Sequence, residues 1–286
     1  MTSVRGSTKV VGVMGDPIAH SLSPVIHNAA FAALDMDWVC VAMQTPEGLA
    51  DDAVRGMRAM GIVGMSVTMP HKAAVIGALD SLSDDASALD SVNCISNRDG
   101  KLIGLNTDGP GFVAGLRHDF GFEPSGADCV VLGAGGAARS VVLALARAGA
   151  RSVKVINRSA ANAELAAKLA GPVGSVAGPE ALATADLVVN ATSVGMAGVN
   201  PGDPSGAEAL PCDPSLLGST QVVVDLIYNP VETAFMKAAA ERGARVSNGV
   251  SMLVHQAAVA FEQWTGVSAP IDAMFDATAS ELSTRG

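Results

Sequence analysis

The sequence is poor in cysteine, contains no long apolar run and has fewer basic than acidic residues, and each shortage excludes a class of protein. Its four cysteines show no CxxC spacing and no clustering with histidine. We therefore expect reduced, buried or half-buried thiols, without a disulfide framework or a metal site. Every apolar stretch is interrupted by Gly, Asp or Arg, so none is long enough to span a bilayer. The N-terminus MTSVRGSTKV lacks the apolar core of a signal peptide, which predicts a cytoplasmic protein.

The charge balance restricts the partners. A formal net charge of −10 opposes non-specific binding to nucleic acid or to an anionic membrane. It leaves room for an anionic small molecule held by a few local donors. With 286 residues, 49% of them hydrophobic and 16% charged, the chain is long enough for two domains.

The first part of the chain alternates short apolar strands with helices. We predict strands at 10–14, 38–43 and 62–67, and helices at about 23–34 and 50–60. Ser23 is the expected N-cap of the first helix, with Pro24 at its first position. The segments 91–97 and 101–106 flank Asp99-Gly100, a sequence typical of a β-hairpin turn. The alternation predicts an α/β domain with a mainly parallel sheet.

A helix at about 109–120 leads to a second α/β unit. We predict strands at 129–132, 152–156, 187–190 and 222–225, and helices near 136–148, 159–170 and 232–241. A long connection rich in Gly and Pro occupies 195–214. Two further helices are expected at about 249–266 and 271–282.

The segment VVLGAGGAARS, 130–140, is typical of a dinucleotide-binding turn. Gly133, Gly135 and Gly136 follow an apolar strand and open a helix. A phosphate can approach such a turn closely, and the helix N-terminus favours its negative charge. The third glycine of the usual fingerprint is replaced here by a small alanine.

The end of the next strand, VINRS at 155–159, indicates which dinucleotide binds. An acidic residue there would hold the ribose 2′-hydroxyl of NAD. Arg158 can instead pair with a 2′-phosphate and stack on the adenine. We therefore predict NADP, with NAD as the alternative.

Polar clusters follow several strands of the first domain, where open α/β sheets bind ligands. The clusters are HSLSP at 20–24, TMPHK at 68–72 and NTD at 106–108, with Asn93 beside another apolar stretch. Such hydroxyls and amides suit a small polyhydroxylated acid. Lys72 and Asp108 form a candidate general acid/base pair.

Nine motifs, in order along nearly the whole chain, resemble those of the shikimate dehydrogenase family. They are GDPIAHSLSPVIHNAAF, GMSVTMPHK, SVNCI, GLNTDGPG, VLGAGGAARS, NRS, VNATSVGM, DLIYNPVETAF and NGVSMLVHQAA. The resemblance implies reversible NADP-dependent reduction of 3-dehydroshikimate to shikimate, in aromatic amino acid biosynthesis. It also implies a substrate domain at 1–108, a Rossmann-like dinucleotide domain at 109–246 and C-terminal helices at 247–286 that return to the first domain. A monomer or a homodimer is expected.

The resemblance also implies roles for individual residues, carried over by position. Lys72 and Asp108 correspond to the catalytic pair. The implied substrate contacts are Ser21 and Ser23, which would hold the carboxylate, and Thr68, Asn93, Tyr228 and Gln256. The implied cofactor contacts are Gly133, Ala134, Gly135, Gly136, Ala137, Asn157, Arg158, Ser159, Thr192, Leu226, Gly249 and Met252. No metal is expected.

Five positions depart from the family pattern. Ser66 stands where Asn is usual, Cys94 where Thr is common, and Ser251 where Gly is frequent. Asn162 occupies a place where many relatives carry a second basic residue, and Trp38 lies near a frequent Tyr. These departures leave quinate or an aminated shikimate open as the substrate.

Two other function classes fit the sequence less well. A redox regulator that binds dinucleotide without turnover would have no need of both Lys72 and Asp108. A methylene-tetrahydrofolate enzyme on a similar plan is disfavoured, because paired serines and Gln256 favour a small polar acid over a flat pterin. The histidines His20, His27, His71 and His255 do not form a metal set, and we expect them to be packing or surface residues.

Overall fold

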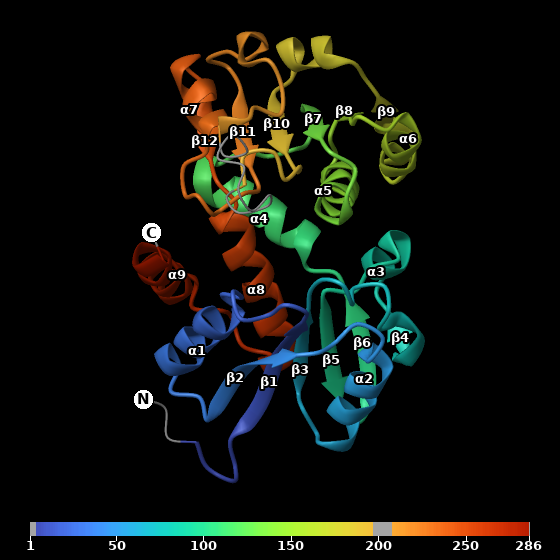
Figure 1. The fold of residues 1–286 in the computed structure, drawn as a ribbon, viewed down its shortest axis with the longest axis vertical. Coiled ribbons are helices and arrows are strands. Elements are labelled where there is room, and N and C mark those ends of the chain that lie inside the picture. Colours follow the sequence, from blue (N-terminus) through green and yellow to red (C-terminus); the bar gives the residue numbers. More distant parts are fainter. Residues whose placement is uncertain (1–3, 197–207, 286) are drawn as a thin grey trace. The chain divides into compact units, whose positions relative to one another are not determined.

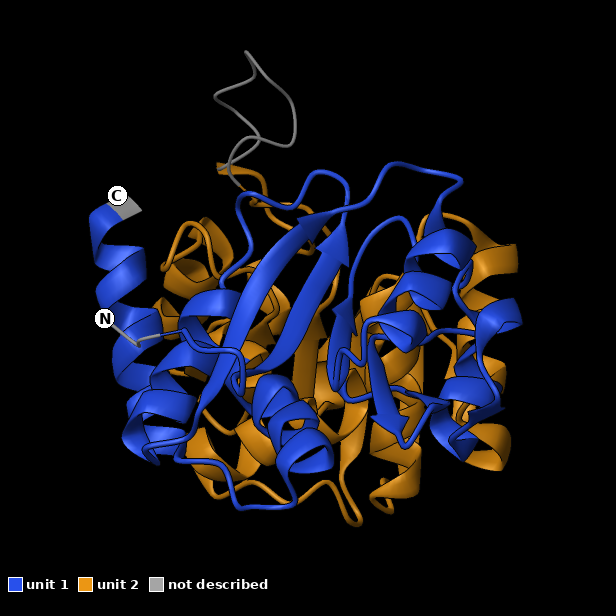
Figure 2. Ribbon diagram, turned by 90° about the horizontal axis from the view of Figure 1, so that it is seen from below, with its two compact units in different colours: residues 1–107, 254–286 blue, residues 108–253 orange. Residues whose placement is uncertain are grey.

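The computed structural model describes residues 4–196 and 208–285, so part of the long connection predicted at 195–214 lies outside the described residues. The chain forms two compact units, shown in different colours in Figure 2: residues 1–107 with 254–286, and residues 108–253. It passes from one unit to the other after Thr107 and again after Leu253. Within the described ranges, none of the helices is both long and apolar enough to cross a membrane.

The first unit is built on a six-stranded sheet of order β2-β1-β3-β5-β6-β4 (Figure 1). Its strands are β1 (Lys9–Gly15), β2 (Trp38–Gln44), β3 (Gly64–Val67), β4 (Ser81–Leu82), β5 (Cys94–Arg98) and β6 (Lys101–Leu105). Strands β2, β1 and β3 are parallel, and β5 runs antiparallel to both β3 and β6. Asp99, with a φ of 52°, and Gly100, with a φ of 86°, form the left-handed turn of the predicted β5–β6 hairpin.

Helices cover both faces of this sheet. They are α1 (Ser23–Ala33), α2 (Ala50–Ala59), α3 (Asp84–Leu89) and the later part of α8 (Val250–Thr265), while α9 (Ile271–Arg285) packs against α1. Val54 and Met57 of α2 pack with Met65 and Val67 of β3. On α1, Phe31 stacks against Trp38 and contacts Phe261 of α8, with ring centroids 5.4 Å apart in both pairs.

The start of α1 differs from the prediction by one residue. Leu22 is the N-cap, and no side chain caps the helix. Ser23 is instead the first helical residue, followed by Pro24, which suits the first turn because it has no N–H to leave unbonded. The Ser23 hydroxyl is therefore not used as a cap.

The second unit contains a parallel sheet of order β12-β11-β10-β7-β8-β9. Its strands are β7 (Asp128–Leu132), β8 (Ser152–Ile156), β9 (Gly174–Val176), β10 (Leu187–Asn190), β11 (Val222–Asp225) and β12 (Arg245–Ser247). Its helices are α4 (Asp108–Phe120), α5 (Gly136–Arg147), α6 (Ala160–Lys168), α7 (Ala234–Glu241) and the first turn of α8. Two mainly parallel sheets confirm the predicted α/β fold class.

Alternation along the central strands of the second unit buries both faces of its sheet. Val131 and Val189 pack into a core with α4, α5 and α6, while Val130 and Val188 face a second core that includes Phe235 of α7. Such strands read as continuous apolar runs, which is typical of parallel sheets covered on both sides.

Candidate active site

In the first unit, the loops that follow β1, β2 and β3 are tied together at the carboxyl edge of the sheet. The Thr68 N–H donates to the Met14 carbonyl at 2.9 Å, and the Thr45 N–H donates to the Gly15 carbonyl at 3.0 Å. A Cβ on Gly15 would lie 2.5 Å from Thr68 Cγ2, so no larger residue fits there without movement. These contacts fix the position of Thr68, a predicted substrate contact.

Ser21 and Ser23 lie where the loop after β1 becomes α1. The Ser23 N–H donates to Ser21 Oγ at 3.3 Å. Ser23 is buried and Ser21 half-buried. Both lie at the N-terminus of α1, where the helix dipole favours an anion.

His71 supports the loop that carries Lys72. This histidine is 1% exposed, and its Nε2 lies 2.7 Å from the Thr45 carbonyl oxygen, which can only accept. The ring is therefore buried and donates to this carbonyl, as predicted for a packing residue. The Lys72 carbonyl accepts from the Val92 N–H at 2.8 Å, which places Lys72 beside the Asn93 segment.

Asn93, Thr107 and Gln256 form a chain of hydrogen bonds across the first unit. Asn93 Oδ1 accepts from the Thr107 N–H at 2.7 Å, and Asn93 Nδ2 donates to Thr107 Oγ1 at 2.9 Å. Thr107 Oγ1 donates in turn to Gln256 Oε1 at 3.4 Å. Asn93 and Thr107 are buried, so their polar groups satisfy one another. Thr107 lies in one of the predicted polar clusters, but this bridging role was not predicted for it.

Asp108 directly follows this network. It is the first residue of α4 and is 9% exposed. Because the Thr107 N–H is held by Asn93, the backbone that enters α4 is fixed at this point. Lys72 belongs to the first unit, and Asp108 is the first residue of the second.

Two departures from the family pattern lie opposite one another. Ser66 on β3 pairs with Cys94 on the antiparallel β5. Side chains of directly opposed residues project from the same face of a sheet and contact each other. Along the chain, Ser66 lies two residues before Thr68, and Cys94 directly follows Asn93.

None of the four cysteines, all of which lie in the described residues, forms a disulfide. Cys40, Cys94 and Cys129 are buried and Cys212 is half-buried. Burial raises the pKa of Cys40 and of Cys129 to about 12. Among the described residues, no group of three or more His, Cys, Asp or Glu side chains could hold a metal ion.

In the second unit, the glycine turn after β7 is open on the side where α5 begins. Gly133 has a φ of +108°, and its added Cβ would approach the Ala191 carbonyl to 3.0 Å. Cβ atoms added to Gly135 and Gly136 would meet nothing within 4 Å. Gly135 is the N-cap of α5, without a side-chain cap. The turn therefore presents uncovered backbone at a helix N-terminus, as a bound phosphate requires.

The segment Asn157–Ser159 lies beside this turn, because the Gly133 N–H donates to the Ile156 carbonyl at 2.8 Å. Asn157 Nδ2 donates to the Ser159 carbonyl at 3.0 Å, and Ser159 Oγ accepts from the Asn162 N–H as the N-cap of α6. Arg158 is exposed and forms no ion pair with any described residue.

A buried polar network joins the ends of β10 and β11. Asp225 accepts from Asn190 Nδ2 at 2.9 Å, from the Ile227 N–H at 3.1 Å and from Thr233 Oγ1 at 2.8 Å. Asn190 Oδ1 accepts from Thr192 Oγ1 at 2.7 Å. Burial raises the pKa of Asp225, while its three donors oppose the rise.

This network was not predicted, although a signal existed. Asn190 and Asp225 each end an otherwise apolar strand, and polar residues at such positions need buried partners. The network fixes the backbone around Thr192 and Leu226, both predicted cofactor contacts.

Other predicted cofactor contacts meet at the end of β11. The Gly249 N–H donates to the Ile227 carbonyl at 3.0 Å, and a Cβ on Gly249 would overlap the Leu226 carbonyl oxygen. Leu226, Met252 and Ala134 are half-buried against the core beneath. The structure thus brings Gly133, Thr192, Leu226, Gly249 and Met252 into one region of the second unit.

Two further predicted site residues also lie in the second unit. Ala137 is exposed on α5. Tyr228 is half-buried after β11 and belongs to the second unit, whereas the other predicted substrate contacts belong to the first.

Comparison with family models identifies three matching segments. Residues 13–95 match the shikimate dehydrogenase substrate binding domain. Residues 117–209 match shikimate/quinate 5-dehydrogenase, and residues 249–277 match the shikimate 5′-dehydrogenase C-terminal domain.

Individual relatives extend over nearly the whole chain. The chain is 44% identical to a shikimate dehydrogenase (NADP(+)) of Symbiobacterium thermophilum, over 97% of this chain and 96% of the relative. It resembles a crystal structure of shikimate dehydrogenase in complex with NADP+, with a TM-score of 0.90, 36% identity and 98% of both chains covered.

A further structure, ligand-free 5-ketofructose reductase of Gluconobacter sp. strain CHM43, matches with a TM-score of 0.87 and 32% identity. The match covers 97% of this chain and all of that one. Relatives with this fold thus include proteins named for different substrates. The family models and the near-complete match at 44% identity show that this chain belongs to the shikimate dehydrogenase family.

Proposed function

We propose that this protein catalyses the NADP-dependent, reversible reduction of 3-dehydroshikimate to shikimate. The observation that carries the proposal is the 44% identity, over almost the full length, to a relative named shikimate dehydrogenase (NADP(+)). The geometry supports the same reaction, because one unit presents clustered hydroxyl and amide groups and the other presents a phosphate-binding turn. We assign substrate binding to residues 1–107 with 254–286, and dinucleotide binding to residues 108–253.

The second unit fits a dinucleotide. The open backbone at Gly135 and Gly136 and the uncapped N-terminus of α5 would receive the pyrophosphate. When bound, NADPH supplies the hydride that reduces the ring carbonyl. Thr192, Leu226, Gly249 and Met252 are proposed to flank its nicotinamide.

Arg158 supports NADP over NAD. Its guanidinium is exposed and forms no ion pair with the described residues, so it remains available to a 2′-phosphate. No carboxylate stands at Asn157, where it would repel that phosphate. Ser159 already accepts a bond as the N-cap of α6, but its hydroxyl hydrogen is still able to donate.

Lys72 and Asp108 are proposed as the acid/base pair. In the reductive direction, a hydride adds to the carbonyl carbon, and the Lys72 ammonium donates a proton to the oxygen that becomes the hydroxyl. In the oxidative direction the Lys72 amine takes this proton back. The Asp108 carboxylate would hold the lysine side chain in place.

The remaining first-unit groups are proposed to orient the substrate. Ser21 and Ser23 would donate hydrogen bonds to its carboxylate at the N-terminus of α1. Thr68, Asn93 and Gln256, with Tyr228 from the second unit, would contact ring hydroxyls. A cytoplasmic location and a monomeric or homodimeric state remain predictions from sequence.

The Ser66–Cys94 pair favours a second candidate of the same class. Ser66 is smaller than the usual Asn, which leaves space for quinate or an aminated shikimate. A panel of kcat/KM values for shikimate, quinate and aminoshikimate, each with NADP and NAD, separates the candidates. We expect shikimate with NADP to give the highest value. If only quinate or only aminoshikimate reacts, that compound replaces shikimate as the proposed substrate. If none of the three compounds reacts, a dinucleotide-binding regulator becomes the better proposal.

A further inference from the structure

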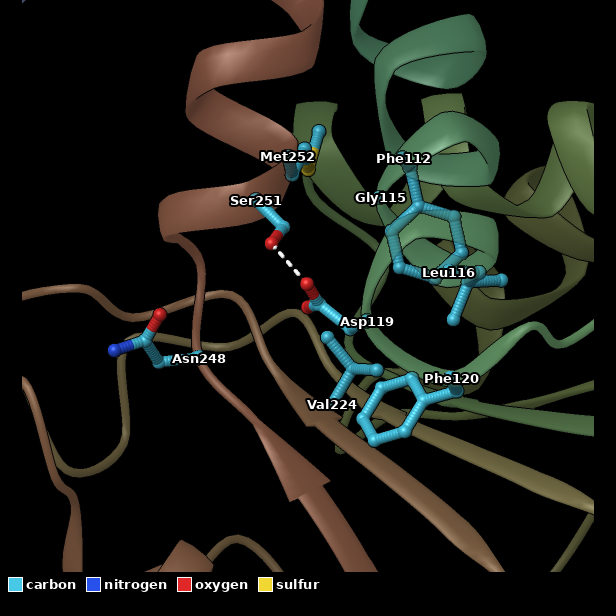
Figure 3. A pocket seen from close by; sticks show the side chains of 9 residues that line it. All are labelled: Phe112, Gly115, Leu116, Asp119, Phe120, Val224, Asn248, Ser251 and Met252. Atoms are coloured by element: carbon cyan, nitrogen blue, oxygen red, sulfur yellow. Dashed lines mark hydrogen bonds between the residues drawn. The ribbon is translucent and has the colours of Figure 1, made fainter. Parts of the chain in front are cut away.

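The first turn of α8 is attached to the C-terminal end of α4 through one carboxylate. Asp119 Oδ1 accepts from Ser251 Oγ at 2.6 Å, as Figure 3 shows. Asp119 Oδ2 accepts from Ser247 Oγ. His118 Nδ1 also lies 3.0 Å from Asp119 Oδ1. Ser251 is 7% exposed, whereas Asp119 lies at the surface, so the bond is partly buried.

Helix dipoles explain why Asp119 needs these partners. It lies in the last turn of α4, where a negative charge is unfavourable. Its acceptor oxygens, however, meet the start of α8, where a negative charge is favourable. The two serine hydroxyls therefore stabilise the Asp119 charge by hydrogen bonding and connect α4 to the start of α8.

Packing confines the same turn. A Cβ on Gly115 of α4 would lie 3.1 Å from Ser251 Cβ and 3.3 Å from the Met252 nitrogen, so the helices approach closely there. Asn248 Oδ1 accepts from the Val250 N–H at 3.0 Å. Gly249 lies against the Leu226 carbonyl on the other side. The hydroxyl of Ser251 adds a polar side-chain bond from the turn itself to α4.

We propose that Asp119 and Ser251 are positioning residues for the nicotinamide end of the dinucleotide site. Asp119 holds the first turn of α8 through Ser251 and Ser247, and thereby fixes Gly249 and Met252. The inference rests on the proposed function, which assigns Gly249 and Met252 to the nicotinamide. Ser251 is one of the departures from the family pattern, since glycine is frequent at this position and could not form the link.

The test compares Ser251→Ala with a matched control, Ser152→Ala. Ser152 Oγ donates to Asp128 Oδ1 at 2.7 Å in the same unit, at the amino end of β8. Both variants remove one serine–aspartate bond, and we expect similar, small decreases in Tm. Only Ser251→Ala should lower kcat, by about tenfold, because small displacements of reacting groups slow chemistry strongly.

The split among kinetic parameters distinguishes positioning from general stability. In Ser251→Ala, KM for 3-dehydroshikimate should stay within about twofold, and the primary deuterium isotope effect on kcat should rise because hydride transfer becomes slower than product release. Asp119→Ala should reproduce this pattern, and the double variant should be no worse than Asp119→Ala alone. Equal kcat values and isotope effects in Ser251→Ala and Ser152→Ala would overturn the proposal. It would also be overturned if the effects of Ser251→Ala and Asp119→Ala on kcat multiplied in the double variant.

A second readout does not depend on the substrate. The emission of bound NADPH arises from its reduced nicotinamide ring. We expect Ser251→Ala, but not Ser152→Ala, to change the lifetime of that emission, with the dissociation constant of NADPH changed by less than about threefold. Unchanged lifetimes in both variants would refute the positioning role. Absence of 3-dehydroshikimate turnover in the unmodified protein would refute the proposed function alone.

Discussion

The two units form their candidate sites from different chemical groups. In the first unit the site consists of side chains, such as Asn93 and Thr107, that bond to one another. In the second it consists mainly of backbone left uncovered by glycines, with the polar side chains Asn190 and Asp225 buried behind it. Substitutions of the polar side chains of the first unit should therefore change chemistry and specificity, whereas substitutions around the glycine turn should change cofactor placement.

The two units also differ in their buried ionisable groups. In the first unit His27 is fully buried, neither ring nitrogen is hydrogen-bonded to a described residue, and burial lowers its pKa to about 3. In the second unit Asp225 has three donors, and burial raises its pKa. Burial disfavours the charged form in both cases. A fall in pH should therefore lower the folding stability through His27 and raise it through Asp225.

The largest expected effect is on the catalytic pair. Lys72→Ala should reduce kcat by about 10²- to 10⁴-fold, because it removes the proposed proton donor, and should leave KM within about tenfold. Steady-state kinetics of 3-dehydroshikimate reduction measures both. Asp108→Asn should cause similar damage, and the double variant should be little worse than either single one. Near-normal turnover in Lys72→Ala would disprove the assigned mechanism.

Acid should destabilise the first unit through His27. The unfolded chain binds a proton on this histidine below about pH 6.5, whereas the folded chain does not until about pH 3, so stability falls as pH decreases between these values. His27→Leu should remove up to about 1.4 kcal/mol per pH unit from the slope of the unfolding free energy. Denaturant titrations at pH 4 to 7 give this slope. The exposed His20→Leu is the control, and an unaltered slope in His27→Leu would show the reasoning to be wrong.

Cofactor choice should depend on one second-unit side chain. Arg158→Ala should weaken NADP binding by roughly 1.5–3 kcal/mol, or about ten- to a hundredfold, because a charge-assisted bond to phosphate is lost. NAD binding should hardly change. Calorimetric titration with both dinucleotides measures the difference. A preference of the unmodified protein for NAD would contradict the prediction, and Asn162, in place of a second basic residue, would be the reason.

The smallest expected effect is on substrate ranking. Ser66→Asn restores the usual family residue opposite Cys94, and we expect the ratio of kcat/KM for shikimate to that for quinate to change by less than about tenfold. Ser66→Ala, which removes the hydroxyl without adding bulk, is the control. A reversal of the ranking would make Ser66 a main determinant of specificity.

The sequence predicted the core strands best. Strands β8, β10 and β11 begin and end where expected, because β10 and β11 are short apolar runs that end in a polar residue and β8 alternates valine with polar residues. The short edge strands β9 and β12, and the two-residue β4, were not predicted, since their residues are half-buried or exposed and lack an apolar run.

Hydrogen bonds between residues far apart in the sequence could not be predicted from it. Asn93 and Thr107 are 14 residues apart, and Thr107 and Gln256 are 149 apart, so only the fold brings them together. The bond between Asp119 and Ser251 spans 132 residues for the same reason. Local cap geometry was also misjudged, because Pro24 is accepted at more than one position of the first turn.

The first unit is expected to provide most substrate contacts and the second to bind the dinucleotide, and hydrogen exchange with one ligand at a time tests this assignment most directly. Shikimate alone should slow amide exchange around residues 68–72 and 93–108, and NADP alone should slow it around residues 133–137, 157–159 and 226. Mass spectrometry of peptides from the unmodified protein resolves these segments. Protection of the glycine turn by shikimate alone, or of the Asn93 segment by NADP alone, would contradict the assignment.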